Sequence, residues 1–172
     1  MNFRKLRAKL FGYNFNPLFG GMKNKVHVEV KIIRANGKVE YIYAKNVNTT
    51  AGLNVARRQL YDPAYALATT VCQYIALSAD TVAPVAGDTT LAGERTDNGL
   101  QRAAGTYSSG GNGVWNQVKT FTYTGGCSIT LAKSGIFDAS GSGNMYHAAL
   151  FGSTATLNTN DQIQVTWTGT LS

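Results

Sequence analysis

The sequence predicts a mainly β protein: an antiparallel β-sandwich or jelly roll with one short helix and an extended N-terminal arm. Several stretches alternate apolar and polar residues with a period of two, which is typical of strands with one buried face. Nineteen glycines and frequent Thr, Ser and Asn indicate many turns between short strands. A chain of 172 residues suits one buried core. We therefore expect an arm over residues 1–25 and a single sandwich domain over residues 26–172.

The N-terminal arm is both basic and apolar. It holds six of the sixteen Lys and Arg residues and no acid. Residues 1–50 carry ten cations against two acids, a net charge of +8, whereas residues 51–172 carry six against seven, a net charge of −1. Pro17 and the glycine pair at 20–21 interrupt the arm, so a helix there would not be stable alone. We expect the arm to become ordered against a partner.

Three roles are open for the arm. Its cations suit the phosphates of a nucleic acid or an acidic protein surface, and a disordered, solubilising tail is the third alternative. Leu and Phe side chains gain nothing in water but fill pockets on a partner, which favours docking onto a protein. The candidate partner-binding residues are Arg4, Lys5, Leu6, Arg7, Lys9, Leu10 and Phe11.

The clearest strand signal is a hairpin near the start of the domain. Residues 26–33 place Val26, Val28, Val30 and Ile32 on one face, and residues 39–43 alternate in the same way. The Asn-Gly pair at 36–37 lies between them and supplies the two positive φ angles that a type I′ turn requires.

One helix and several short strands follow the hairpin. Thr49 and Thr50 offer an N-cap for the helix, and Asp62 and Pro63 end it. Its apolar stripe is expected at Leu53, Ala56 and Leu60. Strands are expected over residues 70–78, 114–124, 127–132, 144–151 and 162–170, with turn clusters at 80–88 and 108–113. Strands at this spacing favour a sandwich or jelly roll.

Histidine and cysteine, the residues that most often perform catalysis or bind metals, are few and scattered. His27 and His147 lie in expected strands with no acid motif nearby, which is typical of surface or packing residues. Cys72 and Cys127 lie far apart in apolar or β-branched surroundings, which favours buried free thiols. Two histidines and two distant cysteines lack the spacing of a zinc site, so we expect no metal and no other cofactor.

Three further motifs favour turns over chemistry. The glycine-rich run at 110–113 lacks the Lys-Ser/Thr ending of a phosphate loop, and residues 140–143 resemble a nucleophile elbow only in composition. A calcium site in the acidic loop is conceivable, but the spacing of its acids does not match an EF-hand, and a solvated loop is favoured. These acids are Asp80, Asp88, Glu94 and Asp97.

Membrane insertion and secretion are not expected. No stretch reaches the roughly 18 apolar residues of a membrane span. The basic stretch at residues 4–9 lacks the continuous apolar core that follows it in a signal peptide. We therefore expect a protein without membrane contact that is synthesised in the cytoplasm.

Several short segments carry a resemblance to a known group of proteins. These are IALS at 75–78, AP at 83–84, GDTTLAGE at 87–94, SGIFDA at 134–139, NDQIQVTW at 160–167 and, more loosely, NTTAGL at 48–53. They resemble segments of structural proteins of tailed bacteriophages, over roughly residues 46–170. Members of that group are tail-fibre, minor tail, neck or capsid-decoration components. The resemblance implies a virion part without catalysis, and it leaves the arm unexplained.

The expected function is therefore that of a non-enzymatic structural component of a phage virion, made in the host cytoplasm, whose partners are other virion proteins. A homo-oligomer is expected, with a trimer as the working guess. One alternative is a carbohydrate-binding module with an aromatic platform, although core packing competes for the strand tryptophans. The other alternative is a protein that contacts nucleic acid through its arm. The candidate platform residues are Trp115, Trp167, Tyr107 and Tyr123.

Overall fold

The computed structural model describes residues 24–61, 71–111 and 113–171. The seven candidate partner-binding residues of the arm lie outside the described residues. The first strand begins at Asn24, so the last two residues of the predicted arm belong to the folded domain. Among the described residues, the one helix is too short to cross a bilayer.

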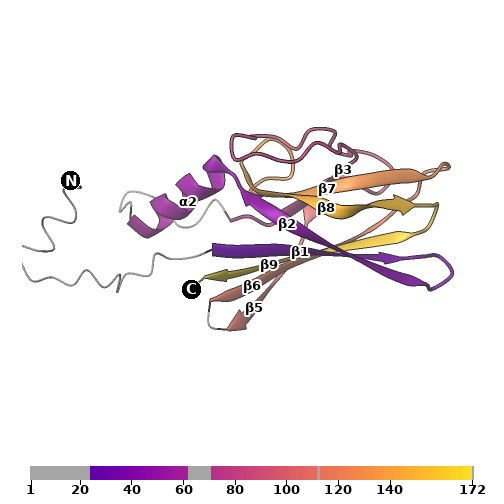
Figure 1. The fold of residues 1–172 in the computed structure, drawn as a ribbon, viewed down its shortest axis with the longest axis horizontal. Helices are drawn as coiled ribbons and strands as arrows, with labels where there is room; N and C mark the ends of the chain where they lie inside the picture. Colours follow the sequence, from indigo (N-terminus) through magenta and orange to yellow (C-terminus); the bar gives the residue numbers. More distant parts are fainter. Residues whose placement is uncertain (1–23, 62–70, 112, 172) are drawn as a thin grey trace, which may run out of the picture.

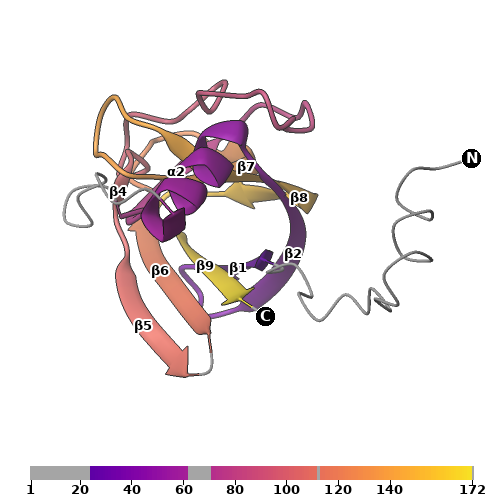
Figure 2. The same ribbon diagram turned by 90° about the vertical axis from the view of Figure 1, so that its left-hand side faces the viewer.

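The described residues form one antiparallel sheet that curls into a nearly closed barrel around an apolar interior (Figures 1 and 2). The order of its nine described strands is β4-β3-β7-β8-β2-β1-β9-β6-β5. The predicted mainly β, antiparallel architecture with one short helix is confirmed. The elements are β1 (Asn24–Ile33), β2 (Val39–Asn48), α2 (Thr50–Tyr61), β3 (Tyr74–Ser78), β4 (Ala103–Ala104), β5 (Thr106–Gly111), β6 (Val114–Thr122), β7 (Ile129–Phe137), β8 (Met145–Leu157) and β9 (Gln162–Leu171).

The barrel interior holds the apolar positions of the period-two pattern. The predicted inward face of β1 is confirmed, and the neighbouring β9 directs Ile163, Val165 and Trp167 into the same core. Opposite walls face one another across this core as the two layers of a sandwich do. Burial of these side chains supplies the main stabilisation of the fold, at roughly 25 cal/mol per Å² of apolar surface.

The chain itself joins the two ends of the sheet. The end strands β4 and β5 are consecutive in sequence, and only Gly105 separates them. The Gly105 amide donates to the Gln73 carbonyl at 2.7 Å. A Cβ at this position would lie 2.9 Å from Gln117 Oε1 and 3.2 Å from Ile75 Cδ1. The glycine therefore permits the close crossing from β3 to β6 that completes the barrel.

The first hairpin forms as predicted, but its turn differs. Of the two central residues only Gly37 has a positive φ, 84°. The Gly37 amide donates to the Arg34 carbonyl, and the Arg34 amide donates to the Lys38 carbonyl, both at 2.8 Å. The type I′ prediction was wrong. This is a three-residue loop with glycine in the left-handed position, and the Asn36 side chain instead accepts from the Lys38 amide at 3.0 Å.

The predicted helix is confirmed over Thr50–Tyr61, and Thr49 is its N-cap. The predicted stop at Asp62 and Pro63 lies outside the described residues. Thr49 Oγ1 accepts from the Gly52 amide at 3.1 Å. Of the predicted apolar stripe, Leu53 is exposed, whereas the unpredicted Val55 is buried. The side chains of Ala56 and Leu60 lie outside those that the structure describes. A Cβ on Gly52 would lie 2.4 Å from the Tyr146 carbonyl oxygen. The helix therefore lies against β8 through its smallest residue.

The long β3–β4 connection, residues 79–102, covers the outer face of β3, β7 and β8. Leu91 packs there against Ala76, Phe137 and other residues of a second apolar cluster. Arg102 lies 3.5 Å above the centre of the Phe137 ring and pairs with Glu94 through two hydrogen bonds of 2.8 and 2.6 Å. The barrel therefore has one covered side.

Several strands differ from their predicted extents. β3 begins at Tyr74, later than the predicted start at residue 70, which lies outside the described residues, and β6 ends at Thr122, before the predicted end at residue 124. Residues 108–111, predicted as part of a turn, belong to β5, which pairs with β6. β7 continues to Phe137 and β8 to Leu157. The serine- and glycine-rich residues 140–143 form the turn between β7 and β8, as predicted.

Candidate protein-binding surfaces

The outer face of β2 carries an exposed row of large side chains, here called the tyrosine stripe: Val39, Tyr41 and Tyr43. Tyr41 is 53% exposed and Tyr43 is 64% exposed. On the neighbouring β1, Lys31 lies opposite Tyr41, and Glu29 lies opposite Tyr43. The other face of β2 buries Ile42 and Ala44 in the core, so the backbone that presents the stripe is held rigidly.

Beyond β1, the outer wall is polar and uncharged. Gln164 and Thr168 of β9 are hydrogen-bonded across the sheet to Thr120 and Asn116 of β6, at 3.0 and 2.7 Å. These side chains therefore pair with one another across the two strands. The tyrosine stripe adds exposed aromatic side chains, which are enriched at protein interfaces. Lys31 and Glu29 of β1 lie between the stripe and this polar wall.

The valine loop, residues 81–87, is a second exposed apolar surface. Val82 is 69% exposed and Val85 is 61% exposed. Their amides donate to the carboxylates that flank the loop, Val82 to Asp80 at 3.1 Å and Val85 to Asp88 at 2.9 Å. Thr50, the first residue of α2, donates its amide to the Ala86 carbonyl at 2.7 Å. The loop is thus fixed at both ends and at the helix, while its apolar side chains face solvent.

A pocket of about 360 Å³ lies beside the valine loop. Val82, Val85 and Ala92 supply apolar walls, Asp88 contributes an acid, and Lys133 of β7 also lines the pocket. The Lys133 ammonium is buried and forms an ion pair with Asp80. The pKa of Asp80 is lowered, chiefly by this hydrogen bond from Lys133.

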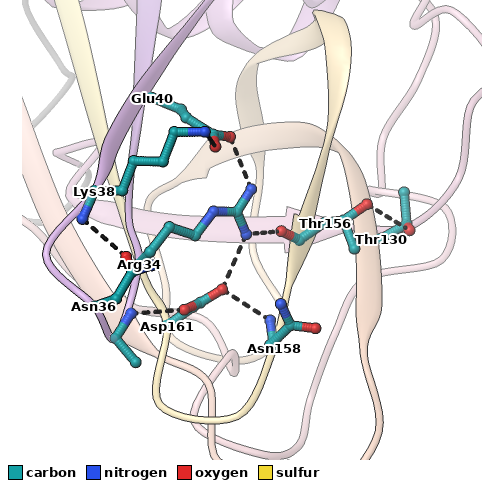
Figure 3. A network of polar contacts seen from close by, with 9 residues as sticks. Arg34, Asn36, Lys38, Glu40, Thr130, Thr156, Asn158 and Asp161 are labelled. Carbon is teal, nitrogen blue, oxygen red and sulfur yellow. Dashed lines mark hydrogen bonds and ion pairs between the residues drawn. The ribbon is translucent and has the colours of Figure 1, made fainter.

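At the end of the barrel that bears the β1–β2 turn, a polar network joins two turns (Figure 3). Arg34 pairs with Glu40 at 2.7 Å and with Asp161 at 2.9 Å. Asp161 also accepts from the amides of Ala35 and Asn158. Burial raises the pKa of Asp161, but these two amides and Arg34 outweigh it and lower the pKa overall. Every group of this network serves to hold a turn, so we assign it a structural role.

His147 is buried between two tryptophans inside the barrel. Its ring centre lies 6.3 Å from that of Trp115 and 6.0 Å from that of Trp167, and the planes are stacked. Burial lowers the pKa of His147 to about 4, so the imidazole is neutral at pH 7. Asn46 Nδ2 lies 3.5 Å from the Nδ1 of its ring. His27, in contrast, is exposed on β1. The structure therefore shows one packing histidine and one surface histidine, as predicted.

The four aromatic residues of the sugar-binding alternative do not form one platform. Trp167 and Tyr123 are buried, and the Trp167 indole donates to Ser134 Oγ at 3.2 Å. Trp115 is half-buried against His147, and only Tyr107 is fully on the surface. This arrangement gives no shared surface on which a sugar ring could stack.

The acidic residues of the loop do not converge on a common site. Asp80 pairs with Lys133, Glu94 with Arg102, and Asp97 with Arg95 at 2.7 Å, while Asp88 has no cationic partner among the described residues. Within the described part of the chain, no three acids, histidines or cysteines gather as metal ligands. The cysteines Cys72 and Cys127 are free thiols. Burial raises the pKa of Cys72 to about 11, but Cys127 is exposed, which corrects the prediction that it is buried.

No protein-family model matches the chain, and no curated protein is significantly similar to it. The likeness to phage structural proteins therefore stays a prediction carried by the quoted segments.

Sequence reasoning missed both exposed surfaces. In an alternating strand, a tyrosine and a buried aliphatic residue give the same apolar signal, so the orientation of Tyr41 and Tyr43 was undetermined until the inward face of β2 was known. The valine loop was predicted only as a turn cluster. Its signal was the run VAPVA at 82–86, which is unusually apolar for a solvated loop.

Proposed function

We propose that this chain is a non-enzymatic structural component of a phage virion that binds neighbouring subunits in the capsid, tail or neck. The observation that carries the proposal is the presentation of exposed apolar side chains on two rigid supports, the tyrosine stripe and the valine loop. Rigid apolar surfaces bind partners at low cost, because little conformational entropy remains to be lost.

The buried polar groups support a structural role. Thr49, Lys133 and Asp161 each hydrogen-bond to a different part of the chain, and each fixes a helix end, a loop or a turn. His147 contacts tryptophans and an amide. The polar side chains of the interior are thus used to hold the scaffold that carries the two surfaces.

The segments that resemble phage structural proteins are neighbours in space, which supports the virion assignment. Ile75 of the IALS segment pairs directly with Ile136 of the SGIFDA segment. Leu91 of the GDTTLAGE segment packs against Phe137 in the second apolar cluster. Segments 40 or more residues apart thus form one packing unit, as expected if the resemblance reflects a shared substructure.

A homo-oligomer, with a trimer as the expected state, and location in the virion are parts of the same proposal. The arm, with its candidate residues Arg4 to Phe11, is the expected attachment to neighbouring subunits. Contact with nucleic acid is the alternative use of its charge. Retention of the full chain on DNA at low salt that falls steeply as salt rises would favour that alternative.

The test is co-sedimentation of the full chain with particles assembled from the structural proteins encoded beside it. We expect the wild type to co-sediment, and replacement of Tyr41 and Tyr43 by Ser to weaken association by roughly tenfold or more, since buried interface tyrosines commonly contribute over 1 kcal/mol each. Tyr107→Ser is the matched control, because Tyr107 is 61% exposed on a different strand. Failure of the wild type to associate with any such particle would refute the proposal.

A further inference from the structure

We infer that the pocket beside the valine loop binds the N-terminal arm of a second copy of this chain, with an apolar side chain of residues 4–11 in the pocket and the basic side chains of the arm next to Asp88. The inference rests on the proposed function and names the partner of one of its surfaces. It assigns a binding site to a face whose role the fold alone does not explain.

The pocket is preformed. Hydrogen bonds from the amides of Val82 and Val85 to the flanking carboxylates fix its walls, and β7 supplies Lys133 from a central position in the sheet. Its volume of about 360 Å³ holds a leucine or phenylalanine side chain and lies at the small end of ligand pockets, which span roughly 300 to 1,000 Å³. An entering side chain would cover Val82 and Val85, the most exposed apolar residues of the loop.

The charge of the pocket selects a cationic occupant. Lys133 and Asp80 neutralise one another in their ion pair. Asp88 has no cationic partner in the described part of the chain, so one negative charge remains at the rim. Beside a low-dielectric apolar wall, that charge attracts a cation more strongly than an isolated surface carboxylate would.

The arm has the matching chemistry within eight residues. Residues 4–11 read RKLRAKLF, so four cations alternate with Leu6, Leu10 and Phe11, and no acid is present in residues 1–25. A docked apolar side chain would bring a neighbouring cation to the rim. The nearest counterpart in the described domain, KIIRANGK at residues 31–38, has three cations and is already part of β1 and its turn.

The reach of the arm permits contact with another copy. Twelve residues, 12–23, lie between the docking segment and β1, and a fully extended stretch of that length spans about 40 Å. A domain of this size has a radius of gyration of roughly 15 Å, so a neighbour lies well within reach. Repeating the contact around a rotation axis closes a ring such as the expected trimer, and reciprocal exchange of arms between two copies closes a dimer.

The decisive experiment places the photo-crosslinking residue benzoylphenylalanine at Phe11 of the full chain. We expect irradiation to give crosslinks between chains, with peptides from residues 80–92 as the attachment point by mass spectrometry. Crosslinks to that loop within a single chain would overturn the assignment to a second copy. Crosslinks to other parts of the chain would overturn the assignment of the pocket as the binding site. So would a wild-type chain that sediments as a monomer at tens of micromolar.

Variants of the pocket supply an independent measurement, the dissociation constant of self-association by sedimentation. Val82→Asp should raise it by roughly tenfold or more, because a carboxylate replaces an apolar wall. Asp88→Asn keeps the acceptor for the Val85 amide but removes the charge, and should raise the constant about threefold at low salt and less at high salt. Val71→Asp, at another exposed valine, is the matched control and should leave the constant unchanged.

Failure of the inference is distinguishable from failure of the proposed function. A monomeric chain that still co-sediments with particles would overturn arm exchange between copies and leave the virion role intact. A chain that oligomerises through the pocket but never binds particles would overturn the virion role and leave arm exchange between copies intact.

Discussion

Asp161 in the β8–β9 turn pairs with Arg34 in the β1–β2 turn at 2.9 Å, although 127 residues separate them in sequence. The pair joins the two turns at one end of the barrel, and Asp161 additionally accepts from two backbone amides. One carboxylate thus fixes the exit of β1 and the entry of β9, strands that are neighbours in the sheet.

Replacement of Asp161 should therefore destabilise the whole domain. Asp161→Ala removes one of the two carboxylates that pair with Arg34 and leaves two turn amides without their acceptor. We expect the free energy of unfolding to fall by about 3 kcal/mol, the lower range for breaking a buried pair. Urea denaturation measures this change. Glu40→Gln is the control: Glu40 is more exposed, so its loss should have a much smaller effect. Equal effects of the two variants would contradict the dominant role of Asp161.

The buried His147 should make stability depend on pH. The unfolded chain binds a proton at its imidazole near pH 6.5, whereas the folded chain does so near pH 4. Between these values the unfolded state binds more protons, so the free energy of unfolding falls as the pH is lowered from 6.5 to 4, by about 3 kcal/mol in total. Urea titrations at pH 7 and pH 4.5 test this. His147→Gln should flatten the dependence, and His27→Gln, at the exposed histidine, should leave it as in the wild type.

Gly52 should tolerate no side chain. An alanine Cβ would lie 2.4 Å from the Tyr146 carbonyl oxygen, which belongs to the backbone of β8 and cannot rotate away. We expect Gly52→Ala to lower the free energy of unfolding by about 2 kcal/mol, despite the better helix propensity of alanine. Gly126→Ala, where no atom lies within 4 Å of the new Cβ, is the matched control and should be nearly neutral. Thermal melts followed by circular dichroism compare the two.

The domain should fold without the arm only if the truncation stops before β1. Asn24 and Lys25 already pair with Leu171 and Thr170 of β9. Removal of residues 1–23 should therefore leave the midpoint and cooperativity of unfolding nearly unchanged. Removal of residues 1–30 should abolish cooperative unfolding, because it deletes most of a central strand. If the chain that lacks residues 1–23 is unfolded, the arm is part of the core.

Periodicity predicted the strands best where one face is buried and the other is in water. β1 and β9 satisfy this condition, and their inward faces were predicted correctly. β5 was missed because all six of its residues are exposed, so no apolar pattern marks it. β7 was predicted too short because its last half is covered on both faces and shows no alternation.

The candidate site was harder to predict because it depends on contacts far apart in sequence. Nothing near Lys133 indicates that it would be paired with Asp80, 53 residues away. The exposure of Val82 and Val85 depends on how residues 79–102 are laid over β7 and β8. The basic arm could be predicted from its charge alone, because the charge of a segment is read from its sequence and does not depend on contacts with distant residues.

The single residue between β4 and β5 limits how far the two ends of the sheet can separate. Because Gly105 is all that lies between strands at opposite ends of the sheet, the barrel cannot widen without lengthening the chain at this point. One inserted residue would either loosen the seam or slide β5 by one position against β6, which would reverse the directions of its side chains. Tyr107 would then point the opposite way. This seam is therefore where related chains should vary least in length, even if their sequences diverge elsewhere.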